Sequence, residues 1–193
     1  MKPDFAQWSY KNHRRGVAVL AAGIMGWSLV GHPAAAVRFA DGTVQFAGVP
    51  RLGKVSATDN QAWAWGATYL FTLQVPEDAS EPLGQVMLQQ AEGVDTVEFN
   101  LKRTYAYLNG DRRQTATVEA VNVNPDTLEL TFNPPILPGS TLTIGLRPYN
   151  NPNTGGVYLF GVTAAPVGEK VRSQFIGYGR LQFYDRSFWR GFW

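Results

Sequence analysis

The segment that decides the fold reads TVEAVNVNPDTLELTFNPPILPGSTLTIGL and covers residues 117–146. In its centre, at 127–132, every second residue is large and apolar, and the stretch 141–146 repeats this pattern. A period of two places the apolar side chains on one face of an extended strand. Both stretches are therefore predicted to be half-buried strands of an antiparallel sheet.

Turn-forming residues separate these strands at short intervals. Asn124-Pro125-Asp126 predicts a tight turn between a strand at 117–123 and the strand at 127–132, because proline presets the backbone for a turn. Pro134-Pro135 and Pro138-Gly139-Ser140 are predicted to make the next connection, towards 141–146. The segment thus contains three strands and two connections.

The same alternation recurs elsewhere in the chain. It is found at 69–75 and 97–101, whereas only residues 81–90 are predicted to hold a helical turn or two. Many short strands with turn signals between them are typical of a β-sandwich. The predicted fold class is all-β, an immunoglobulin-like antiparallel β-sandwich with Greek-key connections.

The first 36 residues have the pattern of a secretory signal peptide. A lead containing Lys2, Lys11 and the pair Arg14-Arg15 precedes an uncharged stretch, and Ala34 and Ala36 are small residues at the positions that a signal peptidase reads. Cleavage after Ala36 is predicted. A retained membrane anchor is the alternative, and the arginine pair leaves both the general secretory and the twin-arginine routes open.

Cleavage would leave a domain at 37–185 and a short tail at 186–193. It removes four of 17 basic residues and one of 15 acidic residues, which leaves 13 against 14. This near-neutral balance argues against a nucleic-acid partner. The chain has no cysteine, and both of its histidines, His13 and His32, belong to the leader. Ser-His-Asp and Cys-His catalysis, the common zinc sites and histidine-ligated haem are thereby excluded from the mature domain, and no cofactor is expected.

Four segments resemble the cyanobacterial domain-of-unknown-function 2808 (DUF2808) family. They are VRFADGTVQFAGVPRL (37–52), WGATYLFTLQVPEDASEPLGQVMLQQAEGVD (65–95), GGVYLFGVTAAPVGE (155–169) and FIGYGRLQFYD (175–185). The resemblance implies a protein exported across the inner membrane of a photosynthetic bacterium, to the periplasm, thylakoid lumen or envelope. It implies no established activity and no catalytic residues.

The C-terminal tail is the first candidate for a partner-binding element. Tryptophan, arginine and phenylalanine are enriched at the energetic centres of protein interfaces, and they also suit the boundary between a membrane and water. The alternative is a flap that folds back over the end of the domain. The candidate residues are Arg186, Phe188, Trp189, Arg190, Phe192 and Trp193.

Two further segments are candidates for ligand binding. The loop 148–156 is long and polar, and loops on rigid scaffolds carry many binding functions; its candidates are Tyr149, Asn150, Asn151 and Asn153. In the motif WAWG, Trp63 and Trp65 share one face with Tyr69 and Phe71 if the strand is continuous, which predicts core residues. The alternative is an exposed aromatic row that stacks on sugar rings, as in a carbohydrate-binding module.

The densest acidic cluster consists of Glu77, Asp78 and Glu81. The prediction is a solvated loop in which Asp78 or Ser80 caps a short helix whose first turn holds Glu81. A weak Ca²⁺ site is one alternative. A carboxylate-based hydrolase is another, and it requires these acids to share a cleft with a further acid such as Asp59 or Glu98.

Together these patterns predict a non-catalytic, exported binding or structural accessory protein. Its partner is predicted to be a protein of an envelope or photosynthetic-membrane assembly, contacted through the tail, with the membrane surface itself as a further contact. A carbohydrate-binding envelope module is the first alternative.

Overall fold

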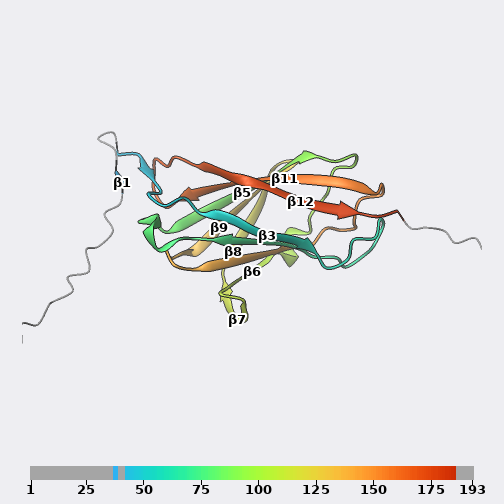
Figure 1. Cartoon of the computed structure of the whole chain (residues 1–193), viewed down its shortest axis with the longest axis horizontal. Coiled ribbons are helices and arrows are strands. Elements are labelled where there is room, and N and C mark those ends of the chain that lie inside the picture. Colours follow the sequence, from blue (N-terminus) through green and yellow to red (C-terminus); the bar gives the residue numbers. More distant parts are fainter. Residues whose placement is uncertain (1–36, 39–41, 186–193) are drawn as a thin grey trace, which may run out of the picture. The chain divides into compact units, whose positions relative to one another are not determined.

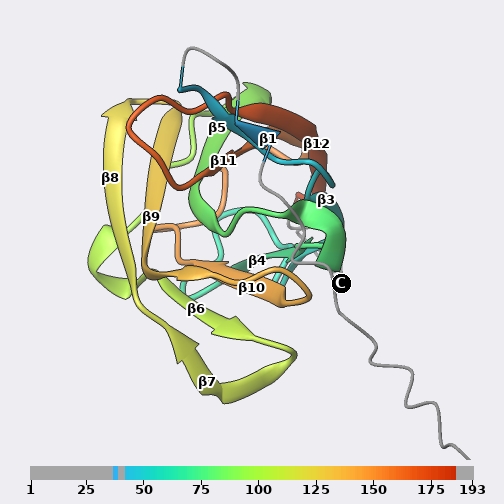
Figure 2. The same ribbon diagram turned by 90° about the vertical axis from the view of Figure 1, so that its left-hand side faces the viewer.

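The strands form two five-stranded antiparallel sheets that pack face to face (Figures 1 and 2). The structure, a computed structural model, describes residues 37–38 and 42–185. Sheet I has the strand order β3-β4-β10-β6-β7 and sheet II has the order β12-β11-β5-β9-β8. A short pair, β1 (Val37–Arg38) and β2 (Val44–Gln45), lies outside both.

Sheet I consists of β3 (Arg51–Ala57), β4 (Tyr69–Gln74), β10 (Thr141–Leu146), β6 (Tyr105–Leu108) and β7 (Asp111–Ala116). Sheet II consists of β12 (Gln174–Phe183), β11 (Gly156–Pro166), β5 (Leu83–Glu92), β9 (Thr127–Ile136) and β8 (Val118–Asn124).

Half of the neighbouring strand pairs join strands that are not consecutive along the chain. Strand β10 lies between β4 and β6, and β5 lies between β11 and β9. The chain therefore crosses repeatedly from one sheet to the other, which confirms the predicted Greek-key sandwich. The two stretches with the clearest alternation, 127–132 and 141–146, are β9 and β10 as predicted.

The core lies between the sheets and is built from the alternating apolar residues. Tyr69, Phe71 and Leu73 of β4 are fully buried, as are Tyr158 and Phe160 of β11 from the opposite sheet. The rings of Phe71 and Phe160 meet edge to face, with centroids 5.9 Å apart. Burial of each such side chain stabilises the fold by roughly 1.5–3 kcal/mol, so this contact joins the two layers.

The helical prediction at 81–90 is wrong, because most of this stretch belongs to strand β5. Val86 and Leu88 point into the core with a period of two, and β11 and β9 pair with the strand on both sides. The described part contains two short 3₁₀ turns, η1 (Glu77–Ala79) and η2 (Leu101–Arg103). Neither these nor any other described helix is long and apolar enough to cross a membrane.

Two further local predictions need correction. Val97 and Phe99 are buried, but they lie in an irregular segment in which Phe99 makes a single bridge to Pro148. Pro134-Pro135 belongs to β9 and not to the connection after it. The pairing of β9 with β5 shifts register here, so the prolines occupy positions without a ladder partner in that pairing.

Candidate functional site

Segments far apart in sequence meet at the end of the sandwich where β3 and β12 terminate, on the right of Figure 1. They are the β3–β4 loop at 58–68, the β10–β11 loop at 147–155, and residues 184–185 after β12. Backbone hydrogen bonds join them: the N–H of Trp63 donates to the carbonyl of Pro152 (3.0 Å), that of Asn151 to Ala64 (2.9 Å), and that of Tyr184 to Asn60 (2.9 Å).

The buried side chain of Asn151 holds this arrangement of loops in place. It is 1% exposed, and its Nδ2 donates to the carbonyl oxygens of Asp59 and Gln61 at 2.9 Å each. Its Oδ1 accepts a 3.0 Å hydrogen bond from the hydroxyl of Tyr69 in the core. Buried polar groups require such partners. Asn151 therefore positions the loops and is not free to contact a ligand, in contrast to the prediction for the 148–156 loop.

The other predicted residues of that loop point to solvent. Tyr149 is 60% exposed, and Asn150 and Asn153 are exposed as well. The backbone N–H of Tyr149 donates to the carbonyl of Glu98 (3.0 Å), which ties the loop to the segment before η2. Three of the four candidates are thus accessible on a loop with an anchored backbone.

The buried phenol of Tyr69 predicts a loss of stability in alkali. Burial raises the pKa of Tyr69 far above its ordinary value, and the neighbouring Tyr158 adds to the rise. Because the pKa is higher in the folded state, its contribution to stability is complete below the unfolded pKa of about 10 and is lost as the pH rises above it. We expect the free energy of unfolding, measured by urea denaturation, to fall steeply above about pH 10.

The control for this effect is Tyr69→Phe. The variant is expected to be less stable at neutral pH, because Asn151 loses its hydrogen-bond donor. Above pH 10 its stability should decline less steeply than that of the wild type. An identical alkaline slope in both proteins would show that other groups, such as Tyr158, whose pKa is also raised by burial, account for the whole effect.

The two tryptophans of the WAWG motif lie on the surface, and the prediction of core residues is wrong. Trp63 is 55% exposed and Trp65 is 86% exposed. In contrast, Ala62, which precedes Trp63, and Ala64, which lies between the two tryptophans, are buried. The strand is not continuous, because β4 begins only at Tyr69. The motif is therefore turned so that the small residues face the protein and the indoles face solvent. We call this end of the sandwich, with the exposed side chains of Trp63, Trp65, Tyr149 and Tyr184, the aromatic end.

A cleft of ≈ 710 Å³ opens beside Tyr149, and sequence analysis did not predict it. Its walls are the segment 96–102, the β8–β9 turn and the end of β5. A smaller hollow of ≈ 250 Å³ shares Tyr149 and Glu98 with it. Buried apolar side chains and exposed polar ones both line the cleft, among them Leu88, Phe99, Leu128, Glu98, Lys102, Asn122 and Asp126.

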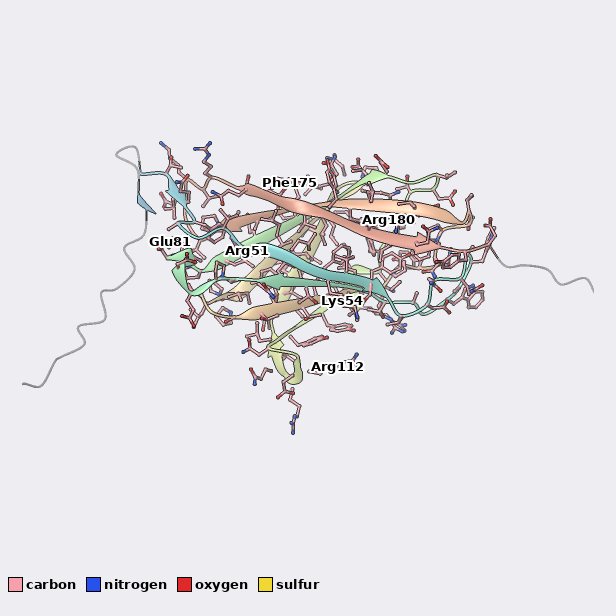
Figure 3. The ribbon with its side chains drawn as sticks, viewed as in Figure 1. Arg51, Lys54, Glu81, Arg112, Phe175 and Arg180 are labelled. Atoms are coloured by element: carbon pink, nitrogen blue, oxygen red, sulfur yellow. The ribbon has the colours of Figure 1, made fainter. Side chains whose placement is uncertain are left out.

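The acidic cluster lies at the opposite end of the sandwich. Its turn η1 follows the end of β4, and the N–H of Gly48 donates to the carbonyl of Asp78 there (2.9 Å). Figure 3 shows Glu81 at this end, whereas Asp59 and Glu98 belong to the loops of the aromatic end. The acids proposed for a hydrolase therefore do not share a cleft.

The predicted cap and the alternative Ca²⁺ site find no support in the geometry of η1. Its N-cap residue is Pro76, no side chain caps the turn, and Glu81 lies after the turn, so the predicted cap by Asp78 or Ser80 is wrong. Within the described ranges, no three histidine, cysteine, aspartate or glutamate side chains gather as a metal site.

Other predicted residues lie outside the described part of the chain. They are the leader at 1–36, with its cleavage residues Ala34 and Ala36, and the tail residues Arg186, Phe188, Trp189, Arg190, Phe192 and Trp193.

Comparison of the sequence with protein families gives one match. Residues 43–183 match the family described as "Protein of unknown function (DUF2808)". The chain belongs to this family. This match confirms the family resemblance that four segments of the sequence indicated. A cyanobacterial origin and export stay predictions. Among curated proteins, no sequence matches the DUF2808 chain.

Solved structures with similar folds include domains of two bacterial adhesins and a bacterial hydrophobin. The N-terminal domain of the Streptococcus gordonii adhesin Sgo0707 is 12% identical, with a TM-score of 0.48; the match covers 73% of the DUF2808 chain and 34% of that chain, about a third of its length. The collagen-binding domain of a Staphylococcus aureus adhesin is 7% identical, with a TM-score of 0.41 and coverage of 72% and 99%. BslA, a bacterial hydrophobin, is 17% identical, with a TM-score of 0.41 and coverage of 72% and 97%. No ligand is transferred from these proteins to the DUF2808 chain.

Proposed function

We propose that this DUF2808 domain is a non-catalytic carbohydrate-binding module of an exported protein, and that its ligand binds at the aromatic end. The observation that carries the proposal is the outward orientation of Trp63 and Trp65. The neighbouring alanines fill the inward positions, which larger side chains would occupy if the loop served only to complete the core.

Because the two indoles are exposed, the fold does not gain the stabilisation that their burial would provide. An aromatic side chain buries about 150–250 Å² in a protein interior, which corresponds to a few kcal/mol at ~25 cal/mol per Å². The loop is held in this orientation by the hydrogen bond from Trp63 to Pro152 and by the amide of Asn151. A rigid aromatic surface loses little entropy on binding, so the arrangement is suited to a ligand.

The chemistry of the aromatic end fits a sugar chain. A flat indole or phenol ring packs against the apolar face of a sugar ring, and the exposed amides of Asn150 and Asn153 can hydrogen-bond to hydroxyl groups. The cleft beside Tyr149 provides concave space for further sugar units. The acidic cluster at η1 lies at the opposite end of the sandwich, so it does not contact a ligand bound at the aromatic end.

The prediction that tests this function concerns the double variant Trp63→Ala, Trp65→Ala. We expect its affinity for the isolated envelope polysaccharide of the source cells to fall about tenfold or more, since two stacking contacts are lost. The thermal unfolding midpoint should remain close to the wild-type value, because both side chains are exposed. Sedimentation of the protein with insoluble polysaccharide measures the first quantity, and calorimetry measures the second.

The matched control is Phe175→Ala, which removes an aromatic side chain of similar exposure (55%) from the other end of β12 (Figure 3). This variant should bind as the wild type does. A similar loss of binding in both variants would indicate unspecific adhesion through exposed aromatics. Unchanged binding by the double tryptophan variant would contradict the proposed function.

A second candidate function is attachment to a protein partner in an envelope or photosynthetic-membrane assembly. It is favoured by the position of Tyr184, which is exposed at the aromatic end and directly precedes Asp185 and the tail. Crosslinking and co-purification of the full chain, beside a version ending at Asp185, tests it. A membrane complex that appears only with the full chain would support the second candidate.

A further inference from the structure

The outer face of sheet I carries a depression of ≈ 600 Å³ with an unusual set of side chains. Three arginines line it: Arg103 from η2, Arg112 from β7 and Arg147 after β10. Tyr105 and Tyr107 of β6 also line it, whereas none of the described lining residues is an aspartate or a glutamate. Figure 3 shows Arg112 on the β6–β7 hairpin, which projects from the sheet.

The strand register explains how the two tyrosines reach this face. Tyr105 pairs with Gly145 of β10, and Tyr107 pairs with Thr143, while Ala106 between them is buried. The two rings are nearly parallel, at 16°, with centroids 6.3 Å apart. The ring of Tyr105 occupies the space that a Cβ atom at Gly145 would take. The glycine thus allows an aromatic surface to lie against the sheet.

The charges of the depression lack acidic partners within it. Asp111 is close by, but its carboxylate pairs with Arg113 (3.4 Å), which does not line the depression. Guanidinium groups placed around one hollow raise its electrostatic potential, which attracts an anion. Their planar forks match carboxylate and sulfate oxygens, and they hold an anion in a defined orientation.

The depression is joined to the aromatic end. Nη2 of Arg147 donates a 3.3 Å hydrogen bond to the carbonyl of Gly66, the residue after Trp65. Thr68 of the same loop also lines the hollow. A chain molecule bound at Trp65 can therefore continue into the depression.

We propose that the depression is a subsite for the carboxylate or sulfate groups of an acidic polysaccharide. The inference rests on the proposed function, because it assigns the charge of the glycan bound at the aromatic end. Tyr105 and Tyr107 pack on the sugar rings, and the arginines bind the anionic groups. A lipid bilayer is a poorer fit, because the described lining contains arginines, tyrosines, threonines and one alanine, and no exposed aliphatic side chain that would enter the bilayer.

The experiment measures binding of three probes to the full chain by calorimetry at low salt. They are hexagalacturonate, a sulfated heparin hexasaccharide, and fully methyl-esterified hexagalacturonate, which has the same sugars without charge. We expect at least one charged probe to bind about tenfold more tightly than the ester, since charge-assisted hydrogen bonds are lost with the charge. Equal affinity for the ester and both charged probes, or no binding of the charged probes, would overturn the proposal.

Two neighbouring arginines provide a matched pair of variants. Arg112→Gln is expected to lower the affinity for the charged probe about tenfold, whereas Arg113→Gln, whose side chain is 93% exposed and outside the depression, should change it less than about twofold. An equal loss in both variants would indicate unspecific attraction by net charge and would contradict the proposal. Both side chains are exposed, so neither variant should disturb folding.

Further measurements separate this proposal from the proposed function. Retained binding of envelope polysaccharide that depends on Trp63 and Trp65, without a preference for charged probes, would refute the acidic subsite alone. Binding of charged probes that depends on Arg112 but not on the tryptophans would refute the role of the aromatic end. Binding to phosphatidylglycerol vesicles that depends on Arg112, in the absence of uronate or sulfate binding, would assign the depression to a membrane surface and overturn the proposal.

Discussion

Replacement of Asn151 by alanine is expected to lower the free energy of unfolding by about 3 kcal/mol, because a buried hydrogen-bond network loses its centre. The variant leaves the buried hydroxyl of Tyr69 without its acceptor and the carbonyl of Asp59 without its side-chain donor. The carbonyl of Gln61 keeps only the longer hydrogen bond from the N–H of Ala64 (3.3 Å). Each unsatisfied buried group costs about 1–3 kcal/mol. The β3–β4 loop also loses its side-chain link to the β10–β11 loop.

The measurement is urea denaturation of Asn151→Ala beside Asn150→Ala and Asn153→Ala. Both control residues are exposed in the same loop, so their replacement should change stability by less than about 0.5 kcal/mol. A loss in Asn151→Ala as small as in the two controls would show that the network contributes little. A selective loss would establish Asn151 as the anchor that holds the loop with Trp63 and Trp65 in place.

Most of the fold could be predicted because it depends on a local pattern. The strands at 127–132 and 141–146 carry a large apolar residue at every second position, so only one register buries the apolar face. The stretch 81–90 was predicted incorrectly because glutamine, glycine and glutamate interrupt its pattern. Its strand depends on pairing with β11 and β9, which are distant in sequence.

The sites were harder to predict, because alanine alternates with the aromatic residues there. In WAW and in YAY (105–107), the alternation alone does not determine whether the alanine or the aromatic side chain faces inward. The structure buries Ala64 and Ala106 and exposes Trp65 and Tyr105. An alanine between two aromatic residues was the feature of the sequence that could have indicated both the aromatic end and the depression on sheet I. No such feature marks the three arginines of the depression, since only the pairing of β10, β6 and β7 brings their segments together.

Replacement of Gly179 by alanine is expected to cost about 2–3 kcal/mol, because the added methyl group has no room where the two sheets meet. Gly179 is a buried residue of β12, the edge of sheet II, and it faces β3 and β4 of sheet I. A Cβ atom there would lie 2.9 Å from Cε1 of Phe71 and 3.0 Å from Cγ2 of Val55. Both contacts are closer than packed carbon atoms allow, so the strands must move apart or the core must repack.

Two comparisons separate this steric effect from the general cost of altering a strand glycine. Gly161→Ala, on the adjacent strand β11, adds a methyl group at ordinary contact distance, 3.4 Å from Phe175 and 3.5 Å from Tyr178, and should be neutral or stabilising by about 0.5 kcal/mol. Val55→Ala introduced beside Gly179→Ala should recover part of the loss, because it removes two of the three closest atoms. Additive losses in that double variant, measured by denaturant unfolding, would contradict the assigned clash. Partial recovery of the free energy of unfolding would show that the close approach of β12 to β3 determines the packing at the edge where the two sheets meet.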